Sequence, residues 1–309
     1  MEISKSQYDP ELASLKIAIV GLGLMGGSLA MALRGAAGKL IGLDRNGRTL
    51  KRALELSIVD EIAEPIEVGI RQADLVVLAI PVQGIVSLLE ALPDLRPDGC
   101  MVLDLGSTKG EIGLAMEALP EQFEALGGHP MCGREHSGLD AAVVDLFQGE
   151  TFILCRNART TPAVEAAALQ LVAQIGSEPL FMPASVHDQL VATSSHLPYV
   201  VASLLMGRAW AQAGQDRRLW QVSASGLRDT TRLASSNPEM MLEIMLTNRL
   251  PLLAQIEAYG QELTDMADAL RRQDEPALRT MLETIARQRD AYLREKYGQD
   301  SIRLDGKVI

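Results

Sequence analysis

A glycine-rich segment near the N-terminus constrains the fold of this chain more than any other feature. The apolar run Lys16–Val20 leads directly into the sequence GLGLMGGS, which opens a run of helix-forming residues through Leu33. A GxGxxG pattern between a strand and a helix is typical of the first βαβ unit of a Rossmann-type domain. A second apolar run, Leu40–Leu43, ends in Asp44, about 20 residues on, where a ribose-binding carboxylate is expected. The sequence therefore predicts a dinucleotide site.

Each residue of the glycine segment has a predicted role at that site. Gly21 permits a tight turn, Gly23 lets the backbone approach a pyrophosphate, and Gly26 allows the helix to pack closely on the strand. Leu24 and Met25 begin the helix, so the N–H groups and the positive end of the helix dipole would face the phosphates.

Residues after the second and third predicted strands bear on the identity of the cofactor. Asp44 would accept hydrogen bonds from the adenosine ribose and repel a 2′-phosphate, which favours NAD over NADP. Arg45 keeps NADP open, because a guanidinium there either stacks on adenine, binds a 2′-phosphate or is simply solvated. Pro81 either lies under the cofactor or only ends its strand.

Strand and helix patterns alternate in the first part of the chain and give way to helices alone in the second. Alternation of this kind predicts a parallel, doubly wound α/β sheet. The predicted strands are Lys16–Val20, Leu40–Leu43, Leu75–Ile80, Met101–Leu105, Thr151–Cys155 and Pro179–Met182. From Ala184 onward, apolar residues recur at the spacing of amphipathic helices. We therefore expect a dinucleotide-binding Rossmann-type domain over residues 1–183 and an all-helical domain for substrate binding and dimerisation over residues 184–309.

The helical part has more apolar faces than a small domain needs for its own core. We expect some of them to pack against a second copy, so the chain is predicted to be a homodimer. The net charge of −11, from 29 basic and 40 acidic residues, argues against nucleic acid or an anionic membrane as a partner. No apolar run approaches the roughly 20 residues of a membrane span. Three cysteines without a CxxC pair predict no metal site and favour a reducing cytoplasm.

Two further segments carry residues suited to acid–base chemistry. In DLGSTK, which starts at Asp104, Ser107 follows a predicted strand at the edge of the sheet where ligands bind. Thr108 and Glu111 also match a T-x-x-E capping box, so Ser107 belongs either to the site or to the helix cap. The segment GGHPMCGREHSG at 127–138 has the glycines of an irregular loop, and its His129 is a candidate acid–base group.

Together, these motifs resemble those of the prephenate/arogenate dehydrogenases of tyrosine biosynthesis. The resemblance adds the segments SHLP at 195–198 and GLRDTTRLA at 226–234, and it covers about residues 16–295. It implies an NAD(P)-dependent oxidative decarboxylation, either of prephenate to 4-hydroxyphenylpyruvate or of arogenate to tyrosine. We favour prephenate, with arogenate or dual use of both substrates as the alternative.

The resemblance also implies roles for five residues. His129 matches the family's catalytic histidine, which takes the proton of the ring C4 hydroxyl, and Ser107 matches the serine that completes this hydrogen-bond pair. Arg232 matches the arginine that binds a substrate carboxylate, and His196 matches a histidine beside the substrate. Glu135 matches an acidic residue that some members place near the active site, and otherwise it is a solvated loop carboxylate. Because a base must be neutral, activity is expected to rise with pH near 6.5.

Four neighbouring residues are expected to have no part in the chemistry. His187 lies nine residues before His196, about half a turn out of phase on a continuous helix, so we predict a structural role for it. His136 is predicted to be a plain loop residue. Arg228 is predicted to pair with Asp229, although it could share a helix face with Arg232 and bind a second carboxylate. Tyr199 stands where many relatives have a second histidine, so that histidine's role does not carry over.

Two competing hypotheses remain. A 3-hydroxyacid dehydrogenase of the same architecture would use a lysine in the helical domain, but that domain has none before Lys296. A non-catalytic protein that senses NAD(P) would have no use for His129, Ser107 or Arg232.

Overall fold

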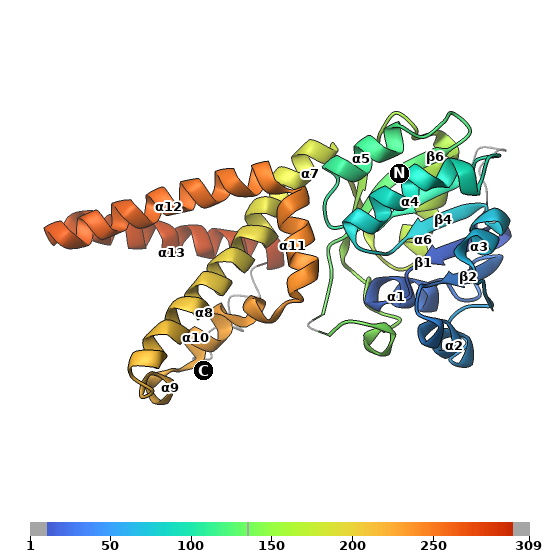
Figure 1. Ribbon diagram of the computed structural model, residues 1–309. Helices are drawn as coiled ribbons and strands as arrows, with labels where there is room; N and C mark the ends of the chain where they lie inside the picture. Colours follow the sequence, from blue (N-terminus) through green and yellow to red (C-terminus); the bar gives the residue numbers. More distant parts are fainter. Residues whose placement is uncertain (1–10, 135, 299–309) are drawn as a thin grey trace. The chain divides into compact units, whose positions relative to one another are not determined.

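The computed structural model describes residues 11–134 and 136–298, which form two compact units (Figure 1). Within the described residues, the first unit comprises 11–196 and 235–251, and the second comprises 197–234 and 252–298. The first unit thus extends beyond the predicted boundary at residue 183. Helices α7 (Ala184–Val191) and α11 (Pro238–Thr247) belong to it, although the sequence assigns both to the helical domain.

The first unit is built on an eight-stranded sheet in the order β3-β2-β1-β4-β5-β6-β7-β8. All neighbouring strands are parallel except β6 and β7, and the strand order reverses between β1 and β4, as in doubly wound sheets. The strands are β1 (Lys16–Val20), β2 (Lys39–Leu43), β3 (Glu61–Ile62), β4 (Leu75–Leu78), β5 (Met101–Asp104), β6 (Glu124–Pro130), β7 (Thr151–Cys155) and β8 (Glu178–Phe181). The predicted fold class is therefore confirmed, with β3 and β6 as strands that the sequence did not indicate.

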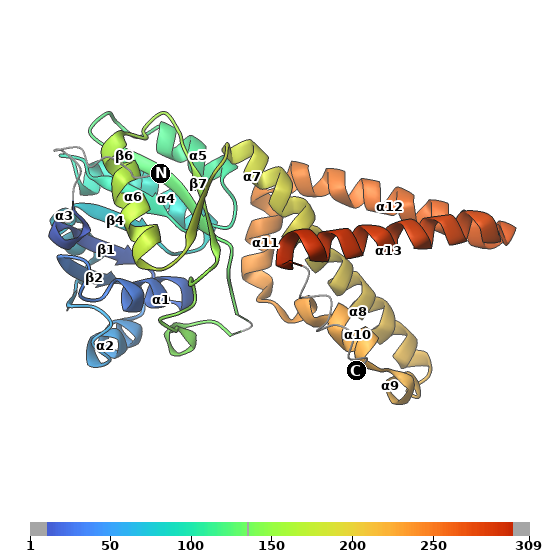
Figure 2. The same ribbon diagram turned by 180° about the vertical axis from the view of Figure 1, so that it is seen from behind.

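Helices cover both faces of this sheet, so its central strands contribute to two separate cores. In β1, Ile17 and Ile19 belong to one apolar cluster, while Ala18 and Val20 belong to the other. Helices α1 (Leu24–Leu33), α2 (Gly47–Glu55) and α6 (Pro162–Gln174) pack into the first cluster. Helices α3 (Ile66–Gln72), α4 (Val82–Leu95) and α5 (Gly110–Glu117) pack into the second. Figure 1 presents the face with α4 and α5, and Figure 2 the face with α6.

Strand β6 corrects the prediction of an irregular loop over residues 127–130. Close contacts between strands leave little space at its two glycines and require glycine at Gly128. A Cβ on Gly128 would lie 2.5 Å from the carbonyl oxygen of Asp104 and 2.9 Å from the ring of Phe152. A Cβ on Gly127 would lie 3.2 Å from the carbonyl oxygen of Cys155. Only glycine fits at Gly128. Glycine suggested a turn in the sequence, but here its missing side chain allows β6 to lie between β5 and β7.

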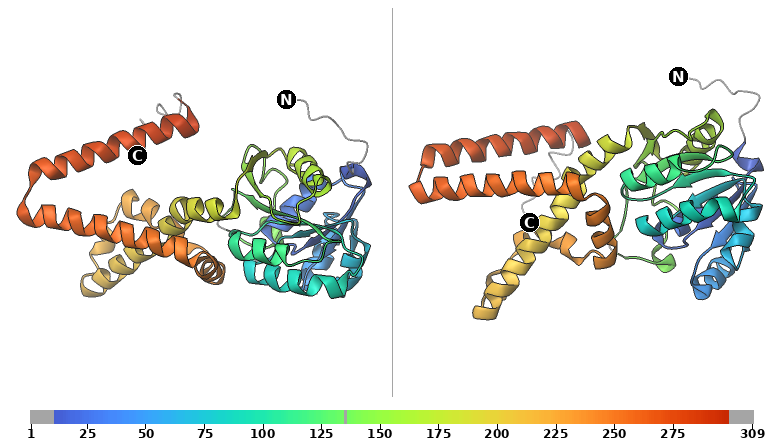
Figure 3. Two further views of the ribbon diagram at one scale, coloured as in Figure 1. Left: turned by 90° about the horizontal axis from the view of Figure 1, so that it is seen from above. Right: turned by 45° about the horizontal axis from the view of Figure 1, so that its top comes forward.

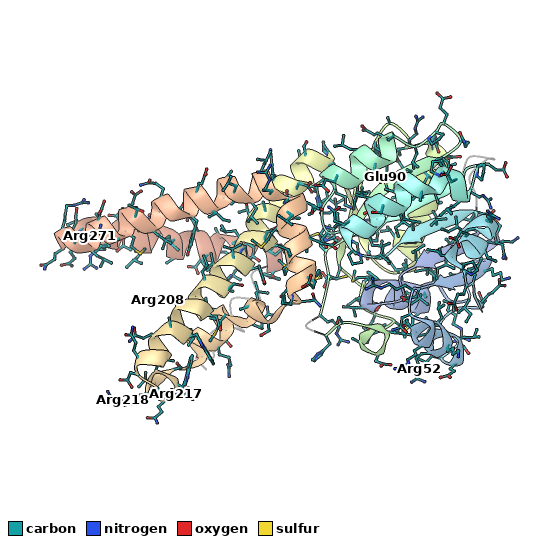
Figure 4. All side chains as sticks on the ribbon, viewed as in Figure 1. Arg52, Glu90, Arg208, Arg217, Arg218 and Arg271 are labelled. Atoms are coloured by element: carbon teal, nitrogen blue, oxygen red, sulfur yellow. The ribbon has the colours of Figure 1, made fainter. Side chains whose placement is uncertain are left out.

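The second unit is helical. It contains α8 (Leu197–Gln215), α9 (Leu219–Val222), α10 (Ser225–Thr230), most of α12 (Arg249–Arg272) and α13 (Glu275–Tyr297). Figure 3 shows the turn at residues 273–274 that joins α12 to α13. No residue of α13 is buried, and in α12 only Leu252 and Ala269 are. Polar side chains on these helices are solvated, as in the exposed ion pair of Arg271 with Asp268 (Figure 4).

One helix is much longer than any uninterrupted apolar run in the sequence. Residues Ala184–Gln215 form a continuous helix of 32 residues, made of α7, a π-helical turn η3 (Ala192–His196) and α8. By length and composition alone this helix is apolar enough to cross a membrane, a test that core helices of other proteins also pass. The sequence has no uninterrupted apolar run of this length, because polar residues occur within the helix.

Candidate active site

The glycine loop has the geometry that its sequence predicts. Gly21 has a φ of +93°, and a Cβ there would lie 2.5 Å from Ile80. A Cβ on Gly26 would lie 1.9 Å from the carbonyl oxygen of Gly21, so the first turn of α1 packs directly on the loop. Gly23 is different, because nothing lies within 4 Å of its Cβ position. The loop is therefore closely packed at Gly21 and Gly26 and open at Gly23.

The start of α1 is a suitable place for an anion. Gly23 is the N-cap residue, and no side chain caps the helix. Leu24 and Met25 follow in the first turn, and both are partly exposed. Unpaired N–H groups at a helix start attract phosphate through hydrogen bonds and the helix dipole.

Asp44 holds the glycine loop and keeps acceptor capacity for a ligand. Its Oδ2 accepts a hydrogen bond from Leu22 N at 2.9 Å, and its Oδ1 accepts one from Asn46 N at 2.8 Å. A carboxylate has about four acceptor positions, so two remain. Arg45 is exposed and forms no ion pair with the described residues. Pro81 is the exposed N-cap residue of α4, a position that fits the end of a strand.

His129 lies at the carboxyl end of β6, opposite Ile153 of β7. Its Nδ1 is 2.8 Å from Nε2 of His187, and the two rings meet edge to face with centroids 5.0 Å apart. None of the described residues forms a hydrogen bond with its Nε2. Ser107 follows β5 at the same edge of the sheet, and its hydroxyl forms no hydrogen bond with the described residues. The expected Ser107–His129 pair is thus not formed, and His187 takes its place.

His187 is fully buried and is itself held by the next residue. Its Nδ1 is 2.7 Å from Oδ1 of Asp188. The Asp188 carboxylate also accepts hydrogen bonds from the backbone N–H groups of Lys109 and Gly110, both at 2.8 Å. Asp188 therefore caps the start of α5. The T-x-x-E capping box is not formed, because Thr108 instead shares a hydrogen bond with a threonine of α11.

His196 lies in the same polar cluster, at the end of the π-helical turn. It is 2% exposed, and its Nδ1 is 3.1 Å from Nδ2 of Asn248, which also donates to the backbone oxygen of Asp188. Burial lowers the pKa of His196 to about 4; Asp188 opposes this shift and His187 adds to it. His196 is therefore neutral near pH 7.

The predicted offset of about half a turn between His187 and His196 assumed an uninterrupted α-helix, and the structure has a π turn between them. A π turn contains an extra residue, so each of its residues advances the helix by a smaller angle than in an α-helix. The π turn at 192–196 lies between the two histidines and removes part of the half-turn offset. Both rings are close enough to lower the pKa of His129.

A buried ion pair supports the cluster from within the sheet. Nζ of Lys109 forms an ion pair with Asp104 and donates to the backbone oxygen of Gly128 at 2.6 Å. Asp104 accepts hydrogen bonds from the N–H groups of Gly106 at 2.7 Å and Gly128 at 3.0 Å. Both side chains are 1% exposed or less. Together they fix the carboxyl ends of β5 and β6. Ser107 follows β5, and His129 lies near the end of β6.

Sequence reasoning missed the partners of His129. Lys109, Asp104, Asp188 and Asn248 were not assigned roles, and His187 was assigned only a structural one. One signal was present: His187 is followed directly by Asp188, a histidine beside a carboxylate in a chain with only four histidines. The long-range contacts that make it meaningful are not visible in the sequence.

The helical unit carries the remaining candidates. Arg232 begins the 3-10 helix η4 (Arg232–Ser235) after α10 has ended, so Arg228 and Arg232 are not on one continuous helix as the alternative required. Arg228 forms the expected ion pair with Asp229, at 2.9 Å. Arg228 also lines a pocket of about 430 Å³ with Met206, Ser223, Ala224, Ser225, Leu227 and Thr231. His136 is exposed, and Glu135 lies outside the described residues.

Comparisons with known proteins identify the family of this chain. Residues 29–179 match the family model described as prephenate dehydrogenase, nucleotide-binding domain, and residues 183–284 match prephenate dehydrogenase, dimerization domain. The prephenate dehydrogenase of Bacillus subtilis is 30% identical over 91% of this chain and 77% of its own length. The cyclohexadienyl dehydrogenase of Zymomonas mobilis is 34% identical over 84% of this chain and 89% of its own.

Solved structures give the same result. The structure of a prephenate dehydrogenase from Aquifex aeolicus, in complex with hydroxyphenyl propionate and NAD⁺, superposes with a TM-score of 0.83 at 29% identity. The match covers 90% of this chain and 98% of that one. The two family models account for both parts of the chain in the expected order. The chain therefore belongs to the prephenate dehydrogenase family.

Proposed function

We propose that this chain oxidises prephenate with NAD and releases 4-hydroxyphenylpyruvate and carbon dioxide. The observation that carries the proposal is the state of His129, whose Nδ1 is occupied by His187 while none of the described residues binds Nε2. A histidine held in this way at the ligand edge of a dinucleotide-binding sheet is suited to accept a proton from a substrate hydroxyl.

The residues of the glycine loop fit NAD. The open position at Gly23 and the uncapped start of α1 suit a pyrophosphate, and the two free acceptor positions of Asp44 suit the hydroxyls of an adenosine ribose. Asp44 would repel a 2′-phosphate, which favours NAD. Arg45 is exposed beside it and keeps NADP as the alternative. We propose that Pro81, at the start of α4, forms part of the same site.

When bound, NAD supplies the acceptor for the hydride that leaves ring C4. The task of the protein is then to orient the substrate and receive a proton. We propose that neutral His129 takes the C4 hydroxyl proton on Nε2 while the carbonyl forms, and that the Ser107 hydroxyl donates a hydrogen bond to the same oxygen. Loss of the C1 carboxylate as carbon dioxide leaves its electron pair in the ring, which becomes aromatic. Aromatisation supplies the driving force.

Three residues are proposed to bind the substrate. Arg232 supplies a planar guanidinium for a carboxylate, His196 lies in the polar cluster around His129, and Glu135, outside the described residues, supplies an acidic group. A second candidate function is dual use of arogenate, because the Zymomonas mobilis relative carries the name cyclohexadienyl dehydrogenase. Parallel assays with prephenate and arogenate, each with NAD and NADP, test both. Oxidation of neither substrate would contradict the proposal.

The pH dependence should differ from that of a free histidine. Burial lowers the pKa of His129 well below 6.5, and electrostatic interactions with the neighbouring His187, Lys109 and His196 lower it further. A base with a lowered pKa stays neutral at lower pH, so activity is lost only as pH falls through that lowered pKa. The acidic limb of kcat/KM is therefore expected below pH 6.5, and a limb at 6.5 or above would contradict this.

Replacement of Arg232 tests the proposed carboxylate contact. A hydrogen bond to a charged group contributes about 1.5–3 kcal/mol, so Arg232→Ala should raise KM for prephenate by about 10- to 100-fold. The affinity for NAD, measured by fluorescence titration, should not change. Arg228→Ala is the matched control, because Arg228 is exposed and already paired with Asp229. Equal effects of the two substitutions would remove Arg232 from substrate binding.

We further propose that the enzyme works in the cytoplasm as a homodimer. Large apolar side chains on the helical unit are exposed in the single chain, among them Leu204 at 70%, Trp210 at 67% and Leu282 at 59%. Residues 183–284 match a domain described as a dimerization domain. These side chains would be buried in the dimer. Light scattering that gave the mass of one chain would contradict this assembly.

A further inference from the structure

A chain of short hydrogen bonds connects the start of α5 to His129. It begins at the backbone N–H groups of Lys109 and Gly110, passes through the Asp188 carboxylate and the His187 ring, and ends at Nδ1 of His129. The four distances are between 2.7 and 2.8 Å. His187 is 0% exposed, so water does not compete for its ring nitrogens.

Asp188 sets the direction of these hydrogen bonds because it is ionised. Burial disfavours its charge, but hydrogen bonds from His187 and from the N–H groups of Lys109 and Gly110 outweigh burial and lower its pKa. An ionised carboxylate can only accept hydrogen bonds, so Nδ1 of His187 must carry a proton. When Nδ1 carries the single proton of the His187 ring, Nε2 is an acceptor, and Nδ1 of His129, at 2.8 Å, is the donor.

We propose that His187 and Asp188 are positioning residues that hold His129 in the Nδ1–H tautomer, so that its Nε2 carries the free lone pair. The proposal rests on the proposed function, and it explains why Nε2 of His129 is unprotonated. Without a partner at Nδ1, neither tautomer of His129 is selected by the protein. With the opposite tautomer, Nε2 would carry a proton and could not accept another.

The same contacts stabilise the product of proton transfer. When the substrate O–H bond breaks and an Nε2–H bond forms, His129 becomes a cation whose Nδ1–H still donates to His187. The charged and titratable groups nearest to it are His187 and His196 from the helix and Lys109 from the start of α5. Lys109 is paired with Asp104, and the negative charge of Asp188 lies behind His187. Asp188 therefore offsets the charge that develops on the pair of rings.

Asp188→Asn is the sharpest substitution. With its carbonyl oxygen on the N–H group of Gly110, the NH₂ group of asparagine takes the place of Oδ1, where it would donate to Nδ1 of His187 and lose the hydrogen bond from Lys109 N. This reverses the tautomers of both histidines: His187 then donates from Nε2, and His129 is left with its proton on Nε2. The corresponding change in Ser-His-Asp hydrolases also selects the wrong tautomer and costs about 10⁴ in kcat. We expect a loss of about 10²–10⁴ in kcat here, with KM and NAD affinity within about twofold.

The tautomer can be observed without any assay. The chain has only four histidines, so long-range ¹H–¹⁵N spectra of the labelled protein with NAD can be assigned with His136→Gln, His187→Gln and His196→Gln. The expected result is Nδ1–H on His129 in the wild type and Nε2–H in Asp188→Asn. An Nε2–H tautomer in the wild type overturns the proposal, even if the enzyme oxidises prephenate. Failure to oxidise prephenate overturns the proposed function instead, whatever the spectrum shows.

A second pair of variants covers the case in which Asp188→Asn does not fold. His187→Gln keeps an amide oxygen near the position of Nε2, whereas His187→Leu does not. We expect the glutamine variant to keep at least about tenfold more kcat than the leucine variant, the value of one hydrogen bond near a charge. Equal kcat in both, or wild-type kcat in Asp188→Asn, overturns the proposal. Asp98→Asn, at an exposed aspartate, is the control for Asp188→Asn.

Discussion

Replacing His129 with alanine is expected to lower kcat for prephenate oxidation by about 10²–10⁴, the range for loss of a general base. The substitution removes the only group in the proposed mechanism that accepts the C4 hydroxyl proton. Binding of NAD should persist, because Gly23, Asp44 and the start of α1 are independent of the histidine. Steady-state kinetics and a fluorescence titration with NADH measure the two effects separately.

The control is His136→Ala, which removes an exposed histidine from the loop that follows β6. It should keep wild-type kinetics. Turnover by His129→Ala at the wild-type rate would remove His129 from the mechanism. A joint loss of turnover and NAD binding would instead indicate a misfolded sheet unit, which circular dichroism would detect.

Replacing Lys109 with methionine is expected to destabilise the sheet unit by about 3–5 kcal/mol, the cost of breaking a buried ion pair. Methionine fills most of the volume but leaves the carboxylate of Asp104 buried without its cation. Both side chains are 1% exposed or less, so solvent cannot replace the lost contact. Urea unfolding followed by circular dichroism measures the change.

Two controls separate charge from packing. Lys39→Met breaks the ion pair with Glu61, whose side chains are 37% and 36% exposed, and should cost at most about 1 kcal/mol. The double variant Lys109→Met with Asp104→Asn removes the buried charge and should recover part of the loss. Equal effects of Lys109→Met and Lys39→Met would contradict the account of the buried pair.

Local patterns predicted the parts of this protein that local chemistry determines. The φ of +93° at Gly21 and the 1.9 Å approach at Gly26 follow from rules that apply within one βαβ unit. The expected strands before and after that unit were found for the same reason. Strand β6 was missed because Gly127 and Gly128 signal a turn unless the neighbouring strands are known to lie against them.

The partners of His129 could not be predicted because they come from distant parts of the chain. His187 is 58 residues from His129, and the contact of Asp188 with Lys109 spans 79 residues. Helical periodicity overestimated the angle between His187 and His196, because a π turn lies between them and no local sequence pattern marks it. Similarly, Thr108 and Glu111 matched a capping box, but the cap was supplied by Asp188 from another helix.

The most direct test of the proposed chemistry follows the hydrogen at ring C4. Prephenate that carries deuterium at C4 should give reduced NAD with one deuterium on the nicotinamide ring, one carbon dioxide and one 4-hydroxyphenylpyruvate per turnover. Mass spectrometry of the nucleotide and of the organic product measures both in one reaction. Reduced NAD without deuterium, oxidation without release of carbon dioxide, or no reaction at all would contradict the proposed function.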